Sequence, residues 1–67
     1  MTRAEQIAGE YRRRIVSGRL RVGDAVPSTR AIMRDHGVAM ATASRVLAIL
    51  QDDGLVESTP GRGSVVR

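Results

Sequence analysis

The sequence has no cysteine and only one histidine, His36, among its 67 residues. Disulfide bonds and thiolate metal sites are therefore excluded, and a single histidine cannot complete a metal centre. We expect neither a metal nor another cofactor, so the fold must be stabilised by apolar packing. A chain of this length forms one small domain, which is expected to span residues 1–67.

Long apolar runs are also missing, because arginine or glycine interrupts each of them. A signal peptide needs an apolar stretch of about 7 to 15 residues after a charged start, and a membrane-spanning helix needs about 20. Neither pattern occurs in this sequence. We therefore expect a cytoplasmic protein without a membrane partner.

Lysine is absent, so all 11 basic residues are arginine; with 7 acidic residues they give a formal net charge of +4. A net positive charge is typical of proteins that bind nucleic acid. The guanidinium group of arginine also offers a rigid fork of hydrogen-bond donors to phosphate and guanine. GC-rich codon usage also explains missing lysines, but it does not remove the charge. Proteins that bind single strands usually present several aromatic side chains, whereas this chain has only Tyr11. Duplex DNA is the expected partner.

Apolar residues recur about every four positions between Ala4 and Ser17, which predicts an amphipathic helix. Thr2 and Glu5 have the spacing of a capping box, and Gly18 stands where a left-handed C-terminal cap is favoured. The stripe predicted to be buried comprises Ile7, Ala8, Tyr11, Ile15 and Val16.

A second helix is predicted after Pro27, which forces the residue before it into an extended conformation. We therefore expect a very short strand at Ala25 and Val26. The Ser28 hydroxyl can accept a hydrogen bond from the unpaired amides of the new helix, which should end at His36.

A third helix is predicted from Ala41 to Asp53, after a short turn that begins at Gly37. The opposite side from its apolar stripe should carry Thr42, Arg45 and Ile49, because each residue rotates by about 100°. Two helices joined in this way form a helix-turn-helix, whose second helix enters the major groove. The stripe predicted to be buried comprises Ala43, Val46, Leu47 and Leu50.

A β-hairpin is predicted at the end of the chain, with a five-residue loop at 59–63. Gly61 and Gly63 can adopt positive φ, which lets Arg62 extend into a narrow minor groove; the alternative is a plain hairpin turn. The order of these predicted elements along the chain indicates a mainly α fold with a small β-hairpin. This fold is a winged helix-turn-helix of three helices plus a wing. The two β-prone runs are Leu55–Ser58 and Ser64–Arg67.

The candidate DNA contacts follow from this arrangement. Arg30 lies in the first turn of the second helix, within reach of a phosphate. Met40 could pack on a thymine methyl group or against the core. The plainer interpretation of the polar candidates is that they are ordinary surface residues. The full set comprises Ser28, Arg30, Met40, Ala41, Thr42, Ser44, Arg45, Gly61, Arg62 and Gly63.

Other classes of function have weaker support. Asp52 and Asp53 are adjacent on a helix, so they diverge and cannot act as an acid and base pair, and no nucleophile set is visible. An enzyme is therefore not expected. The alternative is a winged-helix protein-interaction module, for which Met40 and Ile49 would supply exposed apolar contacts.

Three segments of the chain occur in the same order as in one known family: IVSGRLRVGDAVPSTR, HGVAMATASRVLAILQDDGLVES and PGRGSVV. From about Glu5 to Val66 the chain resembles the N-terminal DNA-binding domain of GntR-family transcriptional regulators. The resemblance implies a winged helix-turn-helix that binds an operator, usually as a homodimer on a pseudopalindrome. It also implies an effector-binding C-terminal domain, absent here, so that this chain is expected to be the N-terminal part of a longer regulator, more often a repressor.

By position, the resemblance assigns DNA contacts to Arg30, Thr42, Gly61 and Gly63. The recognition helix departs from the family pattern. Members often have serine then arginine where this chain has Ala39 and Met40, and the next common arginine falls on Ser44, with Arg45 shifted by one. Two base-reading contacts and the helix cap therefore differ from the usual ones.

Overall fold

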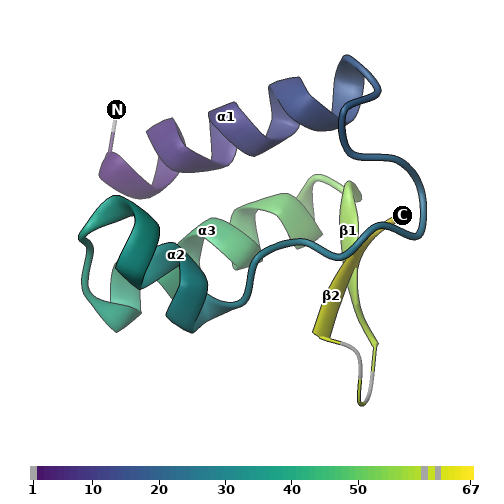
Figure 1. The fold of residues 1–67 in the computed structure, drawn as a ribbon. Helices are drawn as coiled ribbons and strands as arrows, with labels where there is room; N and C mark the ends of the chain where they lie inside the picture. The colour runs from purple at the N-terminus through teal and green to yellow at the C-terminus, as the bar shows by residue number, and fades with distance from the viewer. Residues whose placement is uncertain (1, 60, 62) are drawn as a thin grey trace.

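The computed structural model describes residues 2–59, 61 and 63–67, which form three helices followed by an antiparallel hairpin (Figure 1). The predicted winged helix-turn-helix is therefore confirmed. No helix in this described part has both the length and the apolar character needed to cross a membrane. The elements are α1 (Arg3–Val16), α2 (Thr29–His36), α3 (Met40–Asp52), β1 (Val56–Thr59) and β2 (Gly63–Val66).

The predicted capping box fixes the start of α1. The Thr2 hydroxyl accepts a hydrogen bond from the Glu5 amide at 3.1 Å, and the Glu5 carboxylate accepts one from the Thr2 amide at 3.0 Å. Two amides that have no partner inside the helix are satisfied in this way. At the other end, Gly18 has a φ of 86°, in the left-handed region expected after a helix.

The turn between α2 and α3 is formed by Gly37, which has φ 64° and ψ 38°. The Ser28 hydroxyl caps α2 by accepting from the Ala31 amide at 3.2 Å, as predicted. Helix α3 begins at Met40, one residue earlier than predicted, and its N-cap residue Ala39 makes no side-chain cap hydrogen bond. The departure from the family pattern at Ala39 therefore leaves this helix without a side-chain cap.

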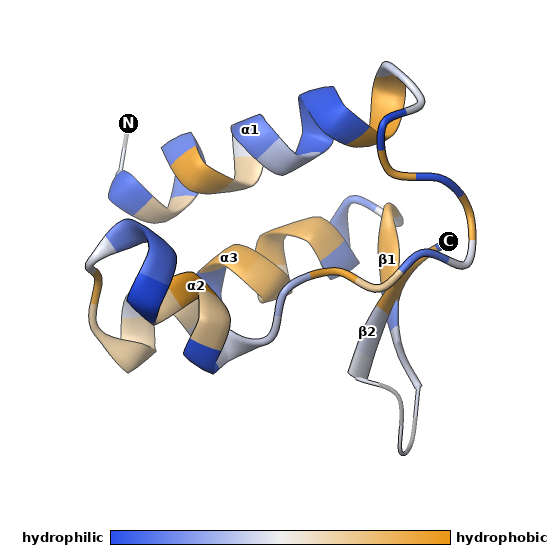
Figure 2. Ribbon diagram, viewed as in Figure 1, coloured by the Kyte–Doolittle hydropathy of each residue, from blue (hydrophilic) through white to orange (hydrophobic). Residues whose placement is uncertain are grey.

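The apolar core lies between α1 and the other two helices, and the first residue of β1 and the last two of β2 close one end. Figure 2 shows α3 as mostly apolar along its length, whereas polar and apolar residues alternate along α1. The largest side chains that are fully buried are Ile7, Ile32, Val46, Leu50 and Val56.

Four apolar residues differ from the sequence prediction, among them Ile15, which is half-buried rather than buried. Val16 is 77% exposed, because nine residues of rotation place it on the opposite side of α1 from Ile7. Leu47 and Ile49 are both half-buried against the core. The buried stripe of α3 follows Ala43, Val46 and Leu50, so Leu47 and Ile49 lie on its two flanks. The prediction that Ile49 is an exposed apolar contact is therefore wrong.

The hairpin pairs further toward its tip than predicted. Thr59 pairs with Gly63, so the strands include the first and last residues of the predicted five-residue loop. The predicted short strand before α2 is present as a single bridge between Ala25 and Val65. Backbone hydrogen bonds on both sides of this bridge, from Val26 to Ser64 and from Val66 to Asp24, hold the segment before α2 against β2.

Polar contacts link α1 to both neighbouring helices. The Tyr11 hydroxyl lies 3.3 Å from His36 Nε2 at the end of α2, with the two rings edge to face. The Arg14 guanidinium lies 5.2 Å from the centre of the Tyr11 ring, and burial raises the pKa of the Tyr11 hydroxyl. Arg12 forms an ion pair with Asp53, the C-cap of α3.

The two glycines Gly9 and Gly37 allow a matched test of this backbone. Gly37→Ala should lower the free energy of unfolding by about 1 kcal/mol or slightly more, because an L residue is strained at φ 64°. Gly9→Ala should raise it by roughly 0.5–1 kcal/mol, because alanine is the better helix former. An added Cβ meets nothing within 4 Å at Gly37 and only the Arg13 guanidinium, at 3.8 Å, at Gly9. In urea denaturation the midpoint should shift to lower urea for Gly37→Ala and to higher urea for Gly9→Ala. A loss of stability in both variants would contradict the expected gain at Gly9.

Candidate nucleic-acid interface

The starts of α2 and α3 and the end of the hairpin where Thr59 pairs with Gly63 all lie along one edge of the domain. In Figure 1 this is the lower edge, whereas α1 crosses the upper side. The arrangement follows from the turn at Gly37, which reverses the chain so that α3 starts close to the edge where α2 started. We call this edge the helix-start edge.

The first turns of α3 present small and polar side chains at this edge. Ala41, Ser44 and Arg45 are exposed, and Thr42 is half-buried. Met40 is 63% exposed, so of its two predicted arrangements the packing against the core is excluded. The polar residues Ser44 and Arg45 lie away from the buried stripe of α3, as the sequence predicted.

The start of α2 brings Ser28 and Arg30 to the same edge. Arg30 is exposed in the first turn. The Ser28 hydroxyl is engaged in capping α2, yet a hydroxyl that accepts one hydrogen bond can still donate its own proton to another acceptor. Both predicted residues are therefore accessible from the helix-start edge.

The two arginines of the helix-start edge, Arg30 and Arg45, lie outside the ion pairs of the described residues. In the part of the chain that the structure describes, the ion pairs are Arg12 with Asp53 and Arg34 with Asp35. Arg30 and Arg45 belong to neither pair. No group of three histidine, aspartate or glutamate side chains in the same part is arranged to hold a metal ion. The exposed Arg30 and Arg45 make the helix-start edge a cationic surface.

The wing has the predicted glycine geometry. Gly61 and Gly63 have φ of 79° and 76°, both in the left-handed region that favours glycine. Arg62, predicted at its tip, lies outside the described residues. A contact that sequence analysis missed joins the wing to α3, because Gln51 Nε2 donates to Ser58 Oγ at 2.7 Å. Two polar residues seven apart give no local signal of this contact.

A second missed feature is a hollow of about 300 Å³ between the start of α1 and the first half of α3. It brings Arg3 to the same opening as Thr42 and Arg45, although α1 and α3 are far apart in the sequence. No local pattern could predict it, since it depends on how the two helices pack. The hollow is lined by Thr2, Arg3, Ala4, Ala41, Thr42 and Arg45.

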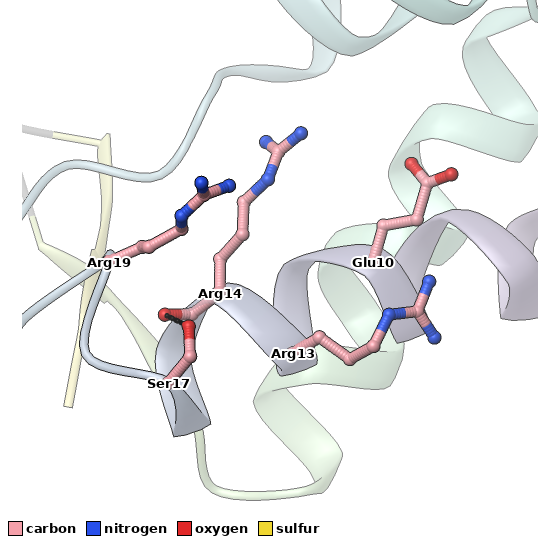
Figure 3. A pocket seen from close by; sticks show the side chains of 5 residues that line it. All are labelled: Glu10, Arg13, Arg14, Ser17 and Arg19. Carbon is pink, nitrogen blue, oxygen red and sulfur yellow. Dashed lines mark hydrogen bonds between the residues drawn. The ribbon is translucent and has the colours of Figure 1, made fainter.

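A larger open hollow lies at the other end of α1. Figure 3 shows Arg14 and Arg19 extending to the same side of the chain, with the Glu10 and Arg13 side chains side by side on the helix. Its volume is about 480 Å³, and Ser17 completes its lining. This end of α1 lies across the molecule from the helix-start edge.

Comparison with known proteins places this fold in a family. The model of the gntR family of bacterial regulatory proteins matches residues 3–66. The chain is 36% identical over 62 residues to the mannosyl-D-glycerate transport/metabolism system repressor MngR of Escherichia coli (strain K12), which covers 92% of this chain. The chain spans about a quarter of that relative, 26% of its length.

Solved structures agree with this result. YtrA from Sulfolobus acidocaldarius, a GntR-family transcription factor, is 31% identical with a TM-score of 0.90, covering all of this chain and 70% of that one. AraR(DBD) in complex with operator ORX1 has a TM-score of 0.92 at 24% identity, covering all of this chain and 81% of that one, which is a likeness of fold alone. The chain therefore belongs to the gntR family of bacterial regulatory proteins, as a winged helix-turn-helix domain of that family.

Proposed function

We propose that this domain binds double-stranded DNA in a sequence-specific manner and represses transcription by occupying an operator. The observation that carries the proposal is the helix-start edge, where two helix starts and the end of the wing at Thr59 and Gly63 lie together with exposed arginines. A single duplex can contact all three elements at once, because the major groove admits a helix and the adjacent minor groove admits a narrow loop.

Each candidate residue has a proposed role. Thr42, Ser44 and Arg45 read base edges in the major groove, and the exposed Met40 packs on a thymine methyl group. Arg30 anchors a phosphate beside the start of α2. The small side chain of Ala41 allows α3 to approach the bases closely. The exposure of these side chains supports the roles.

The wing is proposed to enter the minor groove next to the site that α3 reads. Gly61 and Gly63 support this role, since a tip without Cβ atoms at two positions is narrow. Arg62 is the proposed probe of the groove, whose negative potential attracts arginine.

Repression at an operator is proposed from the comparisons. MngR is described as a repressor and AraR(DBD) as a complex with its operator. We infer that a longer regulator containing this domain binds DNA as a homodimer on a two-fold-related operator. A small-molecule effector would act through a further domain of that longer protein. Sites selected from a random duplex pool should then contain two inverted half-sites.

Salt dependence tests the DNA proposal directly. The affinity of the domain for a random-sequence duplex should fall steeply between about 50 and 200 mM salt, because bound phosphates release their counterions. Arg30→Ala should lower the slope of log affinity against log salt by about 0.9, with a similar loss on every sequence. Fluorescence anisotropy with labelled duplexes measures both quantities.

The rival protein-interaction module makes the opposite prediction, because apolar docking depends little on salt. An affinity that hardly changes with salt would exclude the DNA proposal, and an unchanged slope in Arg30→Ala would exclude the phosphate role of Arg30. The half-buried state of Ile49 leaves this rival with less exposed apolar surface than the sequence indicated.

Arg45 should behave differently from Arg30 if it reads bases. Arg45→Ala should cost about 1–3 kcal/mol on the selected operator and much less on random duplex, so the ratio of the two affinities should fall about fivefold or more. Competition binding between the two duplexes measures this ratio. Equal losses on both duplexes would instead assign Arg45 to the phosphate backbone.

A further inference from the structure

We propose that the DNA interface extends beyond the helix-turn-helix onto the start of α1, where Arg3 binds a phosphate of the duplex beside the bases that Arg45 reads. The inference rests on the proposed function and adds a contact from a helix outside the helix-turn-helix. Its basis is the hollow between α1 and α3, which opens between these two arginines.

The composition of this hollow matches a phosphate of the duplex backbone. Arg3 lies on one side and Arg45 on the other, and both side chains are exposed. Ala4 and Ala41 are small, so the backbone of a duplex can approach the hollow closely.

The capping box holds Arg3 in position. Thr2 and Glu5 are hydrogen-bonded to each other on either side of Arg3, which fixes the backbone of the first turn of α1. The packing of α1 on α3 then fixes this turn beside the recognition helix. Arg3 therefore projects from a rigid support, and only its side chain must be ordered when a phosphate binds.

The negative charge of Glu5 weakens the binding of a phosphate at this position. Its carboxylate is close enough to Arg45 for their charges to interact, although its hydrogen bonds with Thr2 are the larger cause of its lowered pKa. At neutral pH Glu5 is negatively charged, so it offsets part of the attraction that Arg3 and Arg45 exert on the duplex. Removing this charge should strengthen DNA binding.

The hollow at the other end of α1 supplies matched controls. Arg13 and Glu10 line that hollow (Figure 3), on the same helix as Arg3 and Glu5, but neither lines the hollow between α1 and α3. Substitutions of Arg13 and Glu10 change the net charge by the same amount as substitutions of Arg3 and Glu5. Any difference between the paired variants therefore reports position rather than total charge.

The first experiment compares Arg3→Gln with Arg13→Gln on random and operator duplexes. Arg3→Gln should lower the salt slope by about 0.9, which makes the loss of affinity between about 50 and 200 mM roughly 3.5-fold smaller than in the unaltered domain. Arg13→Gln should change the slope by less than half as much. Glutamine and arginine have similar helix propensities, so thermal melting should show both variants folded.

The second experiment compares Glu5→Gln with Glu10→Gln. Glutamine retains the capping box, so the fold should be unaffected. Glu5→Gln should raise the affinity for duplex by about two- to fivefold near 50 mM salt, and the gain should shrink near 200 mM as screening increases. Glu10→Gln should give a clearly smaller gain at either salt concentration.

The outcomes separate this inference from the proposed function. If Arg3→Gln behaves like Arg13→Gln while Arg30→Ala still lowers the slope, the contact at α1 is wrong and DNA binding by the helix-turn-helix stands. If the unaltered domain shows no dependence on salt, the proposed function fails and the contact at α1 fails with it.

Discussion

The apolar contact between α1 and α3 is the constraint on which the rest of the structure depends. Ile7, Ala8 and Tyr11 from α1 share one buried cluster with Val46 and Leu50 from α3. A 67-residue chain without disulfides has little else to hold its elements in place. This contact sets the direction of α3, the Gly37 turn sets α2 relative to it, and the hydrogen bond from Gln51 to Ser58 joins α3 to the wing.

Local patterns in the sequence predicted the helices and strands well because particular residues mark where each of them begins or ends. The capping box, the extended residue before Pro27 and the left-handed Gly37 are effects over three or four residues. Burial at the margin of a helix was harder to predict. Leu47 and Ile49 lie on the two flanks of a buried stripe, and only the direction of the neighbouring helices decides how far each is covered, whereas helical rotation alone exposes Val16. The shorter hairpin loop likewise depends on pairing across strands.

The residues of the candidate site also fall into two groups, those that local patterns predict and those that depend on tertiary packing. Arg30, Ser44 and Arg45 could be predicted because they follow from the helical repeat and from a helix-turn-helix. Arg3 and Gln51 could not, because each acquires its neighbours only when helices and strands distant in sequence pack together. The Tyr11 contact with His36 is of the same kind, since the residues are 25 positions apart. Residues that join elements, rather than those that lie within one, are the ones that sequence patterns miss.

The single bridge between Ala25 and Val65 ties the chain just before α2 to the second strand of the wing. The wing is therefore not an independent arm, because its second strand is hydrogen-bonded to the residues that lead into Ser28. These hydrogen bonds set the distance between the start of α2 and the paired strands of the wing. A duplex can meet both only where its own groove spacing and twist agree with that distance, so base pairs that no side chain touches would still affect binding through the shape they give the helix.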